Sequence, residues 1–513
     1  MHILVINCGS SSIKAAVINH ETGARALELK AERLGQEGKA QYRINGGDPV
    51  SCPADAEAAL EVCIPKMLEE LGDAELEGVG HRVVHGGEEF TAPTRITDEV
   101  VEQIEALIPL APLHNPANLA GMEELQLTVD LSLIELGMEF TRAPRTTDNG
   151  ETINYETVEN LAPPKPDPQV LIGGPIGKGF SWGFGLYAPY LSGHKFPVDG
   201  PQRYVLVDND ASLLLFTHLA VAWQYKNFLR IGGGFQNLPA NFVLVNVTSA
   251  YTGLYGEPED PDLDILTRIT LNSLFNPSGN FGVWVQLFPG LEAAISFQLP
   301  VRIRDDDAKL ETRLPDNAFF ANAEVEGDSV SGQLNFPFMA RAGIRYQRSR
   351  VDYELAFVYE NWSVFEEIQA NPNDVRVTGV PGVGSIRVAP LTIPMNYQDT
   401  VSIRNGAQIQ LKEDIHMRLG HIFEQSAIPD EYYSVFLADA RKNAFTAGAT
   451  YKRPKWSVDA AFAYYLMPDR TITNSQVRQI NPTDSENENT TIVGNGVYSQ
   501  RYLIFGMGFN KSF

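Results

Sequence analysis

The 513-residue chain has little cysteine, no excess of positive charge and no long apolar run. Its formal charge is −24, from 40 Lys and Arg against 64 Asp and Glu, so it has no surplus of cations to neutralise nucleic-acid phosphates. We therefore expect no nucleic-acid partner. No run approaches the roughly 18 apolar residues of a membrane-spanning helix. A membrane-spanning β-barrel stays open, because its apolar residues alternate with polar ones.

Cysteine and aromatic residues are distributed unevenly along the chain. All three cysteines, Cys8, Cys52 and Cys63, precede Gln126, whereas Tyr42 and Phe90 are the only aromatic residues in that first part. Reduced cysteines with few aromatics are typical of a cytosolic domain. A cysteine-free, aromatic-rich stretch is typical of an outer-membrane barrel. We therefore expect two parts shaped by different surroundings.

The first part alternates strand-like and helix-like segments. The pattern predicts strands over His2–Cys8 and 78–84, and helices over 55–71 and 98–108, which together indicate an α/β layer. Residues 1–14 have neither the basic start nor the small-residue cleavage site of a signal peptide. For the chain as written, retention in the cytoplasm is thus the alternative to an outer-membrane location.

From Leu127 onward the spacing predicts strands to the end of the chain. Over 338–346, apolar side chains alternate with polar ones such as Arg345. The alternation changes phase between Leu133 and Ile134, which predicts a β-bulge. The segments are about ten residues long, end in aromatic residues and are joined by loops of unequal length, as in membrane barrels. We predict an antiparallel transmembrane β-barrel; a soluble β-sandwich binding module is the alternative.

One hairpin predicts a register. A two-residue turn at 349–350 places Arg345 opposite Glu354 and Gln347 opposite Asp352. Such cross-strand pairs contribute roughly 0.2 to 1 kcal/mol each. We expect them to keep the polar face wet and to fix the register.

Two motifs in the first part carry chemistry. Asn7–Lys14 (NCGSSSIK) presents backbone N–H groups, hydroxyls and a cation to a phosphate, although a Ser-rich hairpin would explain the same residues. Gly80–Gly87 places Arg82 beside a glycine turn, where a carboxylate or a transferring phosphoryl group can bind. His81 and His85 share one strand face without a third ligand, so we expect no metal there.

These motifs, followed by Pro112–Pro116, resemble the N-terminal part of acetate kinase, a member of the acetate and sugar kinase/actin-like superfamily. The resemblance covers residues 1 to about 122. It implies phosphate and magnesium placement by Asn7, phosphate contacts by Ser10, Ser12 and Lys14, contacts of Arg82 with acetate and the phosphoryl group, and an acetyl-methyl pocket bordered by Val84 and Leu113.

An intact kinase would use ATP and Mg, but the catalytic aspartate and the adenosine-binding domain of the family do not follow in this sequence. Phosphoryl transfer requires groups from both sides of a cleft. We therefore expect an incomplete, inactive kinase segment; acetate kinase activity is the alternative function.

Residues from about 115 to 513 resemble the FadL-type outer-membrane transporters of long-chain fatty acids and hydrocarbons. The motifs that carry this resemblance are Asn115–Gly121, Trp182–Tyr190, Pro394–Thr400, Ile428–Asp439 and the terminal Phe513. The family implies a fourteen-stranded barrel plugged by a small hatch, with entry through an outer groove and sideways exit at a kinked strand. It also implies recognition of Phe513 by the barrel-assembly machinery, and no cofactor.

Asn115–Gly121 fits both resemblances, which places the join within this stretch. We predict a chimera of a truncated acetate-kinase-like α/β segment over 1–122 and an outer-membrane barrel of about 14 strands over 123–513. The expected function is passive transport of long-chain fatty acids or other hydrophobic small molecules. The expected partners are outer-membrane lipid and the hydrophobic ligand.

Overall fold

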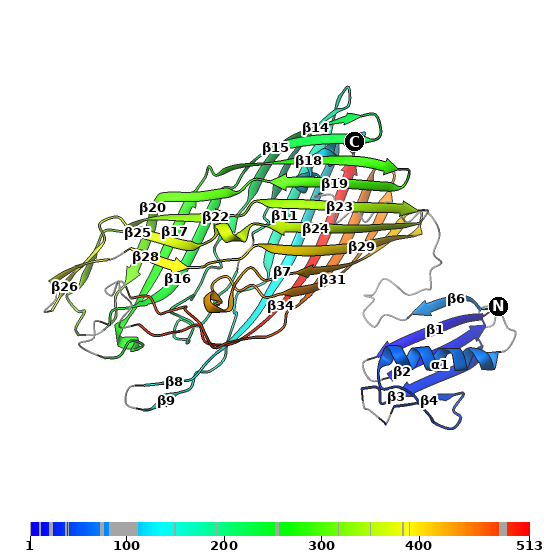
Figure 1. The fold of residues 1–513 in the computed structure, drawn as a ribbon, viewed down its shortest axis with the longest axis horizontal. Helices are drawn as coiled ribbons and strands as arrows, with labels where there is room; N and C mark the ends of the chain where they lie inside the picture. The colour runs from blue at the N-terminus through cyan, green and yellow to red at the C-terminus, as the bar shows by residue number, and fades with distance from the viewer. Residues whose placement is uncertain are drawn as a thin grey trace. The chain divides into compact units, whose positions relative to one another are not determined.

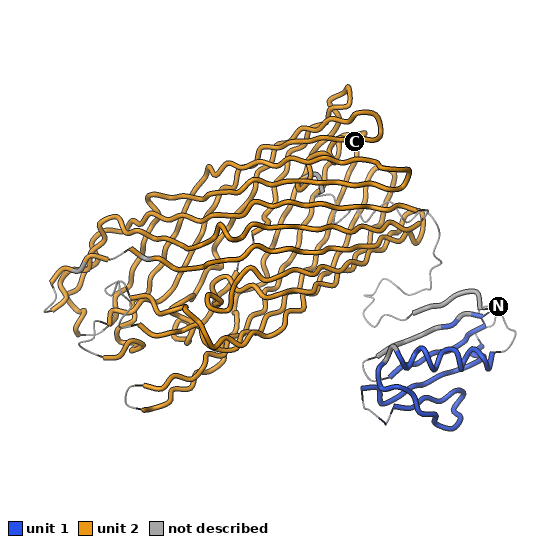
Figure 2. The backbone as a smooth tube through the Cα atoms, viewed as in Figure 1, with its two compact units in different colours: residues 1–94 blue, residues 95–513 orange. Residues whose placement is uncertain are grey.

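The computed structural model describes residues 2–9, 12–19, 24–35, 38, 40–71, 76–81, 111–147, 150–190, 193–251, 256–316, 318–348, 350–381, 384–388, 390–481 and 490–513. The chain divides into two compact units, Met1–Thr94 and Arg95–Phe513 (Figure 2). The boundary at 122 that the sequence predicts stays a prediction.

Unit 1 is a six-stranded sheet with one helix. The strand order is β5-β4-β3-β2-β1-β6, with β1 and β6 parallel. The bounds are β1 His2–Gly9, β2 Ser12–Asn19, β3 Arg25–Glu32, β4 Gln41–Ile44, β5 Val50–Ser51, α1 Ala56–Leu71 and β6 Leu76–His81. Helix α1 buries Ala59, Cys63 and Met67, spaced four apart, against the sheet core. The predicted helix 98–108 lies outside the described residues.

Unit 2 is a closed antiparallel barrel of fourteen strands (Figure 1). In sheet order the strands are β7 Gln126–Arg142, β11 Lys165–Gly177, β12 Phe180–Tyr187, β14 Phe216–Tyr225, β15 Leu229–Asn237, β18 Pro277–Phe288, β19 Leu291–Gln298, β23 Met339–Arg348, β24 Val351–Glu360, β29 Thr400–Lys412, β30 Ile415–Glu424, β31 Lys442–Arg453, β32 Trp456–Leu466 and β34 Gly496–Ser512. Pairing of β34 with β7 closes the ring, so the β-sandwich alternative is wrong.

A second sheet of seven strands continues one end of the barrel and is called the extension (Figure 1). Its order is β13 Leu213–Leu214, β16 Ala240–Ser249, β17 Asp264–Ser273, β20 Val301–Arg313, β22 Ser329–Phe336, β25 Glu367–Pro372 and β28 Leu391–Pro394. The remaining strands are β8 Arg145–Thr146, β9 Thr152–Ile153, β10 Val158–Glu159, β21 Glu324–Glu326, β26 Arg376–Val380, β27 Gly384–Arg387 and β33 Arg470–Ile472. Short 3-10 turns lie at Pro116–Gly121 (η2), Pro261–Leu263, Trp362–Val364 and Asp430–Tyr432.

The outer face of the barrel is apolar. Val129, Leu131 and Leu133 of β7 are exposed, next to Phe505 and Met507 of β34. Exposed aromatic residues also mark the barrel end that has short turns: Phe180, Tyr225, Phe288, Tyr346, Trp456 and Phe513. An apolar belt bordered by aromatic side chains is the surface that a bilayer requires. No helix in the described part of the chain is long and apolar enough to cross a membrane.

Strand β7 contradicts the predicted β-bulge. It pairs with β34 without a register shift over its whole length, so odd-numbered residues face outward throughout. Past Leu133 the outward side chains become polar, as at Glu135 and Glu139, while Met138 and Phe140 are buried inside. The bulge prediction was wrong because the outer surface of the strand becomes polar and its inner surface becomes apolar where the strand leaves the apolar belt, and the apolar residues change side with it.

The predicted hairpin register is confirmed. In the pairing of β23 with β24, Arg345 lies opposite Glu354 and Gln347 opposite Asp352. The Arg345 guanidinium also forms an ion pair with the Asp352 carboxylate at 2.5 Å. The polar face of this hairpin therefore lines the lumen.

The polarity exchange along β7 predicts position-dependent costs of a charge. Leu131→Lys should destabilise the barrel by about 2 to 4 kcal/mol, because it places a cation within the apolar belt. The matched variant Glu139→Lys faces outward on the same strand beyond the belt and should cost less than about 1 kcal/mol. Guanidinium unfolding in lipid vesicles measures both, and equal costs would contradict a belt that ends near Leu133.

Candidate functional site

A short segment, called the hatch, lies inside the barrel. It consists of α2 Ala111–His114 and η2 Pro116–Gly121. Asn115 separates the two turns, and its side-chain oxygen accepts a hydrogen bond from the Ala117 N–H at 3.1 Å. Pro116 occupies the first position of η2, where a missing N–H has no cost. Local capping thus forms the turns, and the barrel wall holds them in place.

Two glycines of β12 receive the apolar side chains of the hatch. Leu113 and Leu119 are fully buried and face Gly185 and Gly183, which lie two residues apart on the lumen side. A Cβ atom at Gly185 would lie 2.1 Å from Leu113, and one at Gly183 would lie 2.6 Å from Leu119. Only glycine permits this approach.

Two further glycines seat the middle of the hatch. A Cβ atom at Gly232 on β15 would lie 2.4 Å from the Pro116 backbone, and one at Gly282 on β18 would lie 1.9 Å from the Asn115 side chain. The Asn280 amide donates a hydrogen bond to the Leu113 carbonyl at 2.8 Å. Four wall glycines and one amide therefore position the hatch across the lumen.

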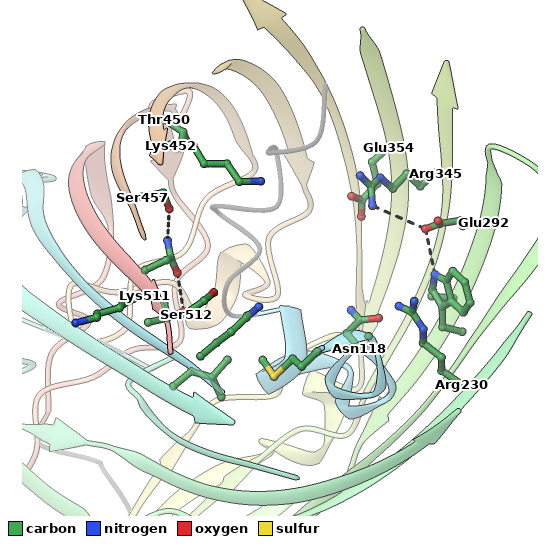
Figure 3. A pocket seen from close by; sticks show the side chains of 18 of the residues that line it. Asn118, Arg230, Glu292, Arg345, Glu354, Thr450, Lys452, Ser457, Lys511 and Ser512 are labelled. Atoms are coloured by element: carbon green, nitrogen blue, oxygen red, sulfur yellow. Dashed lines mark hydrogen bonds and ion pairs between the residues drawn. The ribbon is translucent and has the colours of Figure 1, made fainter. Parts of the chain in front are cut away.

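A cavity of about 670 Å³, called the hatch cavity, lies between the hatch and the barrel wall (Figure 3). Its wall is polar. The Trp284 indole donates to Glu292 at 3.1 Å, Arg345 lies 3.8 Å from the same carboxylate, and Arg230 stacks on Trp284 at 4.1 Å. Lys452 reaches into the space from β31. Such a wall favours water over an apolar molecule.

A second cavity of about 360 Å³, the extension cavity, lies over the extension sheet. Its lining is mainly aliphatic and includes Ile265, Ile269, Leu310, Val330, Val375, Ile393 and Phe436. Hydrophobic pockets with a few polar groups are the usual sites for small apolar ligands. These two cavities therefore differ in chemistry, because one has a polar lining and the other an apolar lining.

A buried ionic cluster joins several loops to the end of β7. Arg142 at the end of β7 donates two hydrogen bonds to the Glu259 carboxylate, at 2.6 and 2.9 Å, and both side chains are buried. Tyr155 and Thr491 donate to the same carboxylate at 2.9 and 2.6 Å. The cluster thus joins three loops to the barrel strand. Arg203 forms a similar ion pair, in which its guanidinium donates a hydrogen bond to the Asp264 carboxylate at 2.7 Å.

Three of the predicted kinase residues lie on two neighbouring strands of unit 1. Asn7 pairs with Lys14, and Ser12 with Gly9, in the β1–β2 ladder, so the predicted hairpin strands form. Lys14 is exposed.

Ser10, Arg82 and Val84 lie outside the described residues. Leu113 is described in unit 2, where it belongs to the hatch. In the described part of the chain no group of three or more His, Cys, Asp or Glu side chains is placed to hold a metal ion.

The glycine seats and the Arg142–Glu259 pair were missed by the sequence reasoning. Gly183 and Gly185 alternate with large side chains on β12, which is the signal of a lumen face that something approaches closely. The ion pair joins residues 117 positions apart and has no local signal.

A closed, plugged barrel with an apolar outer belt is the architecture of a membrane transport protein. The family model described as outer membrane protein transport protein (OMPP1/FadL/TodX) matches residues 110–513, and the chain belongs to this family. The model of the Acetokinase family matches residues 2–134. The chain is therefore a chimera that joins an acetate-kinase-like segment to a transport barrel.

Curated acetate kinases match the first part of the chain. Acetate kinase of Pseudomonas aeruginosa strain LESB58 is 53% identical over 125 residues, which are 24% of this chain and 32% of that protein. Acetate kinase of Deinococcus radiodurans is 45% identical over 130 residues, 25% of this chain and 32% of that protein. The chain thus spans about a third of the length of the curated relatives that it matches.

Solved structures match the barrel. A FadL homologue of Pseudomonas aeruginosa aligns with a TM-score of 0.64 at 14% identity, covering 79% of this chain and 94% of that one. The toluene transporter TodX of Pseudomonas putida aligns with a TM-score of 0.54 at 13% identity, covering 82% and 96%. These likenesses support the fold, and the predicted barrel of about 14 strands is confirmed.

The glycine seat predicts a hatch that one side chain can dislodge. Gly185→Val would occupy the space of Leu113 and should expose residues 111–121, raising their backbone hydrogen exchange at least tenfold. Gly343→Val is the matched control, because a Cβ atom at this lumen-facing glycine meets nothing closer than 3.4 Å. Mass spectrometry of exchange in detergent measures both variants, and equal exchange would contradict the seat.

The ionic cluster predicts acid-sensitive loops. Burial raises the pKa of Glu259, but the hydrogen bonds and charge of Arg142, together with the hydrogen bonds from Thr491 and Tyr155, outweigh burial and hold that pKa below its usual value. Because the folded-state pKa is lowered, the stabilisation is complete above about pH 4.3 and is lost as the pH falls further. Glu259→Gln leaves Arg142 buried without a counter-charge and should cost the loop contacts about 3 kcal/mol at neutral pH.

Hydrogen exchange of residues 256–264 measures this cost. Glu257→Gln is the matched control, because its ion pair with Arg145 is half exposed and should contribute less than about 1 kcal/mol. Equal effects of the two variants would show that the buried pair does not hold the loop.

Proposed function

We propose that unit 2 lies in the outer membrane and carries hydrophobic small molecules passively across it, entering through the extension cavity. One observation carries the proposal: strand surfaces exchange polarity where the barrel leaves its apolar belt, so the interior becomes apolar toward the extension. Met138 and Phe140 of β7 and Tyr498 of β34 belong to this interior. A molecule that leaves water can therefore stay among apolar side chains.

The proposed cargo is a long-chain fatty acid or another hydrophobic molecule. Support comes from the aliphatic lining of the extension cavity and from membership of the transport family. The related barrels include one named for toluene transport. Binding of any of these molecules to an apolar wall is stabilised by about 25 cal/mol per Å² of apolar surface buried.

The polar lining of the hatch cavity affects the route by which an apolar cargo can leave the barrel. An apolar cargo would lose its burial in that space, so we propose that it leaves sideways through the wall. Strand β11 is the best candidate, because Pro166, Pro168 and Pro175 supply no N–H to the ladder and its pairing with β12 shifts register after Pro175. The proposed path thus avoids the polar wall of the hatch cavity that contains Arg345.

Kinase activity is not part of this proposal. Residues 2–134 resemble about a third of an acetate kinase, and the proposed role of Asn7, Ser10, Ser12, Lys14 and Arg82 in holding phosphate, acetate, ATP and Mg would need the rest of the cleft. The outer-membrane lipid and the assembly machinery that would recognise Phe513 are proposed partners of the barrel alone.

A charge in the extension cavity should block apolar cargo. Ile269→Asp places a carboxylate among aliphatic side chains and should lower the initial rate of fluorescent fatty-acid uptake into vesicles that contain the protein by at least tenfold. Ile269→Leu should keep the rate within about twofold, because it conserves volume. Heat-modifiable gel mobility confirms that both barrels form. Unchanged uptake by Ile269→Asp would overturn entry through this cavity.

A further inference from the structure

Unit 1 brings two thiols together. Cys63 lies on α1 and is fully buried, whereas Cys52 is partly exposed and follows β5. The Cys52 N–H donates to the Ala40 carbonyl at 3.1 Å, which fixes this stretch against the sheet. Asp55 begins α1 by accepting from the Ala58 N–H at 3.0 Å. These two hydrogen bonds therefore fix the stretch that carries Cys52 and the start of the helix that carries Cys63.

The two side chains share one core. Cys52 packs against the buried cluster that contains Cys63, and each thiol influences the pKa of the other. Burial, with the neighbouring Cys52, raises the pKa of Cys63 to about 12, and burial also raises that of Cys52. Both are thus protonated thiols in a reducing compartment, where they pack as small apolar groups.

We propose that Cys52 and Cys63 form a disulfide once the chain leaves the reducing cytoplasm, so that unit 1 carries a covalent lock between the end of β5 and helix α1. Disulfides persist on both sides of an outer membrane and not in the cytoplasm. The bond would close a short loop and constrain the unfolded chain. The formation of this disulfide rests on the proposed outer-membrane location of unit 2 and does not depend on the transport path.

The reaction needs an oxidant of the disulfide class, such as oxidised glutathione. The more exposed Cys52 thiolate attacks one sulfur of the oxidant, forming a mixed disulfide and releasing one thiol. The Cys63 thiolate then attacks the Cys52 sulfur and releases the second thiol. Two protons leave the cysteines and two thiols appear on the oxidant, so atoms and electrons balance.

Tryptic peptides separate the pair from the third cysteine. Residues 44–66 contain Cys52 and Cys63 with no internal Lys or Arg, whereas Cys8 lies within residues 1–14. The full chain in detergent is exposed to oxidised glutathione, alkylated under denaturing conditions and digested without reductant. We expect peptide 44–66 to be lighter by two hydrogen atoms and to take up no alkyl group, while Cys8 takes up one.

Two variants serve as controls. Cys8→Ser should leave the loss of two reactive thiols unchanged, and Cys52→Ser should leave Cys63 alkylated in full. Alkylation of both cysteines in peptide 44–66 after oxidation would overturn the proposal, as would a bridge from either cysteine to Cys8. Persistent glutathione on Cys52 with free Cys63 would also overturn it, because it would show that the second thiol cannot reach the first.

Discussion

Closure of the sheet between β7 and β34 is the constraint on which the rest of the barrel depends. In a bilayer an unpaired strand edge would leave backbone N–H and C=O groups without partners, at several kcal/mol for each group. The pairing runs from Gln126 opposite Ser512 to Arg142 opposite Gly496 without a shift. An unbroken register of this length fixes the height of every side chain along both strands, and therefore where each one meets lipid, water or the interior.

The polarity exchange follows from that fixed register. Along a strand with strictly alternating side chains, apolar residues can occupy either the outward or the inward positions. Strand β7 has apolar residues at its outward positions first and at its inward positions farther along. Leu131 is exposed on the outer surface of the barrel, whereas Phe140 is buried in its interior. The exchange links the apolar outer belt to the proposed transport, because the interior is apolar at the level where the outer surface is no longer apolar. A polar pair such as Arg345 and Asp352 can then occupy the lumen at the other end.

Sequence reasoning reached the fold because alternation and turns are local. The closed barrel and the Arg345–Glu354 register were predicted from spacing and one turn, and both are confirmed. The bulge near Leu133 was wrong because the same change of phase arises from a change of surroundings, which a single strand does not reveal. The glycine seat of Leu113 and the partner of Arg142 depend on residues distant in the chain. Spacing carries no information on such contacts.

The stretch from 110 to 134 is matched by both family models, and the structure explains why one segment suits the hatch. Its turns are formed locally, since Asn115 caps η2 and Pro116 fits its first position. Its contacts with the wall need a carbonyl, small side chains and two leucines, which Asn280 and the lumen glycines accept. The segment forms its turns by local hydrogen bonds and needs only space beside the lumen glycines. We therefore expect that it can be joined to a foreign N-terminal part and still fit the barrel. Among the described residues, the barrel wall therefore supplies the contacts that hold the hatch.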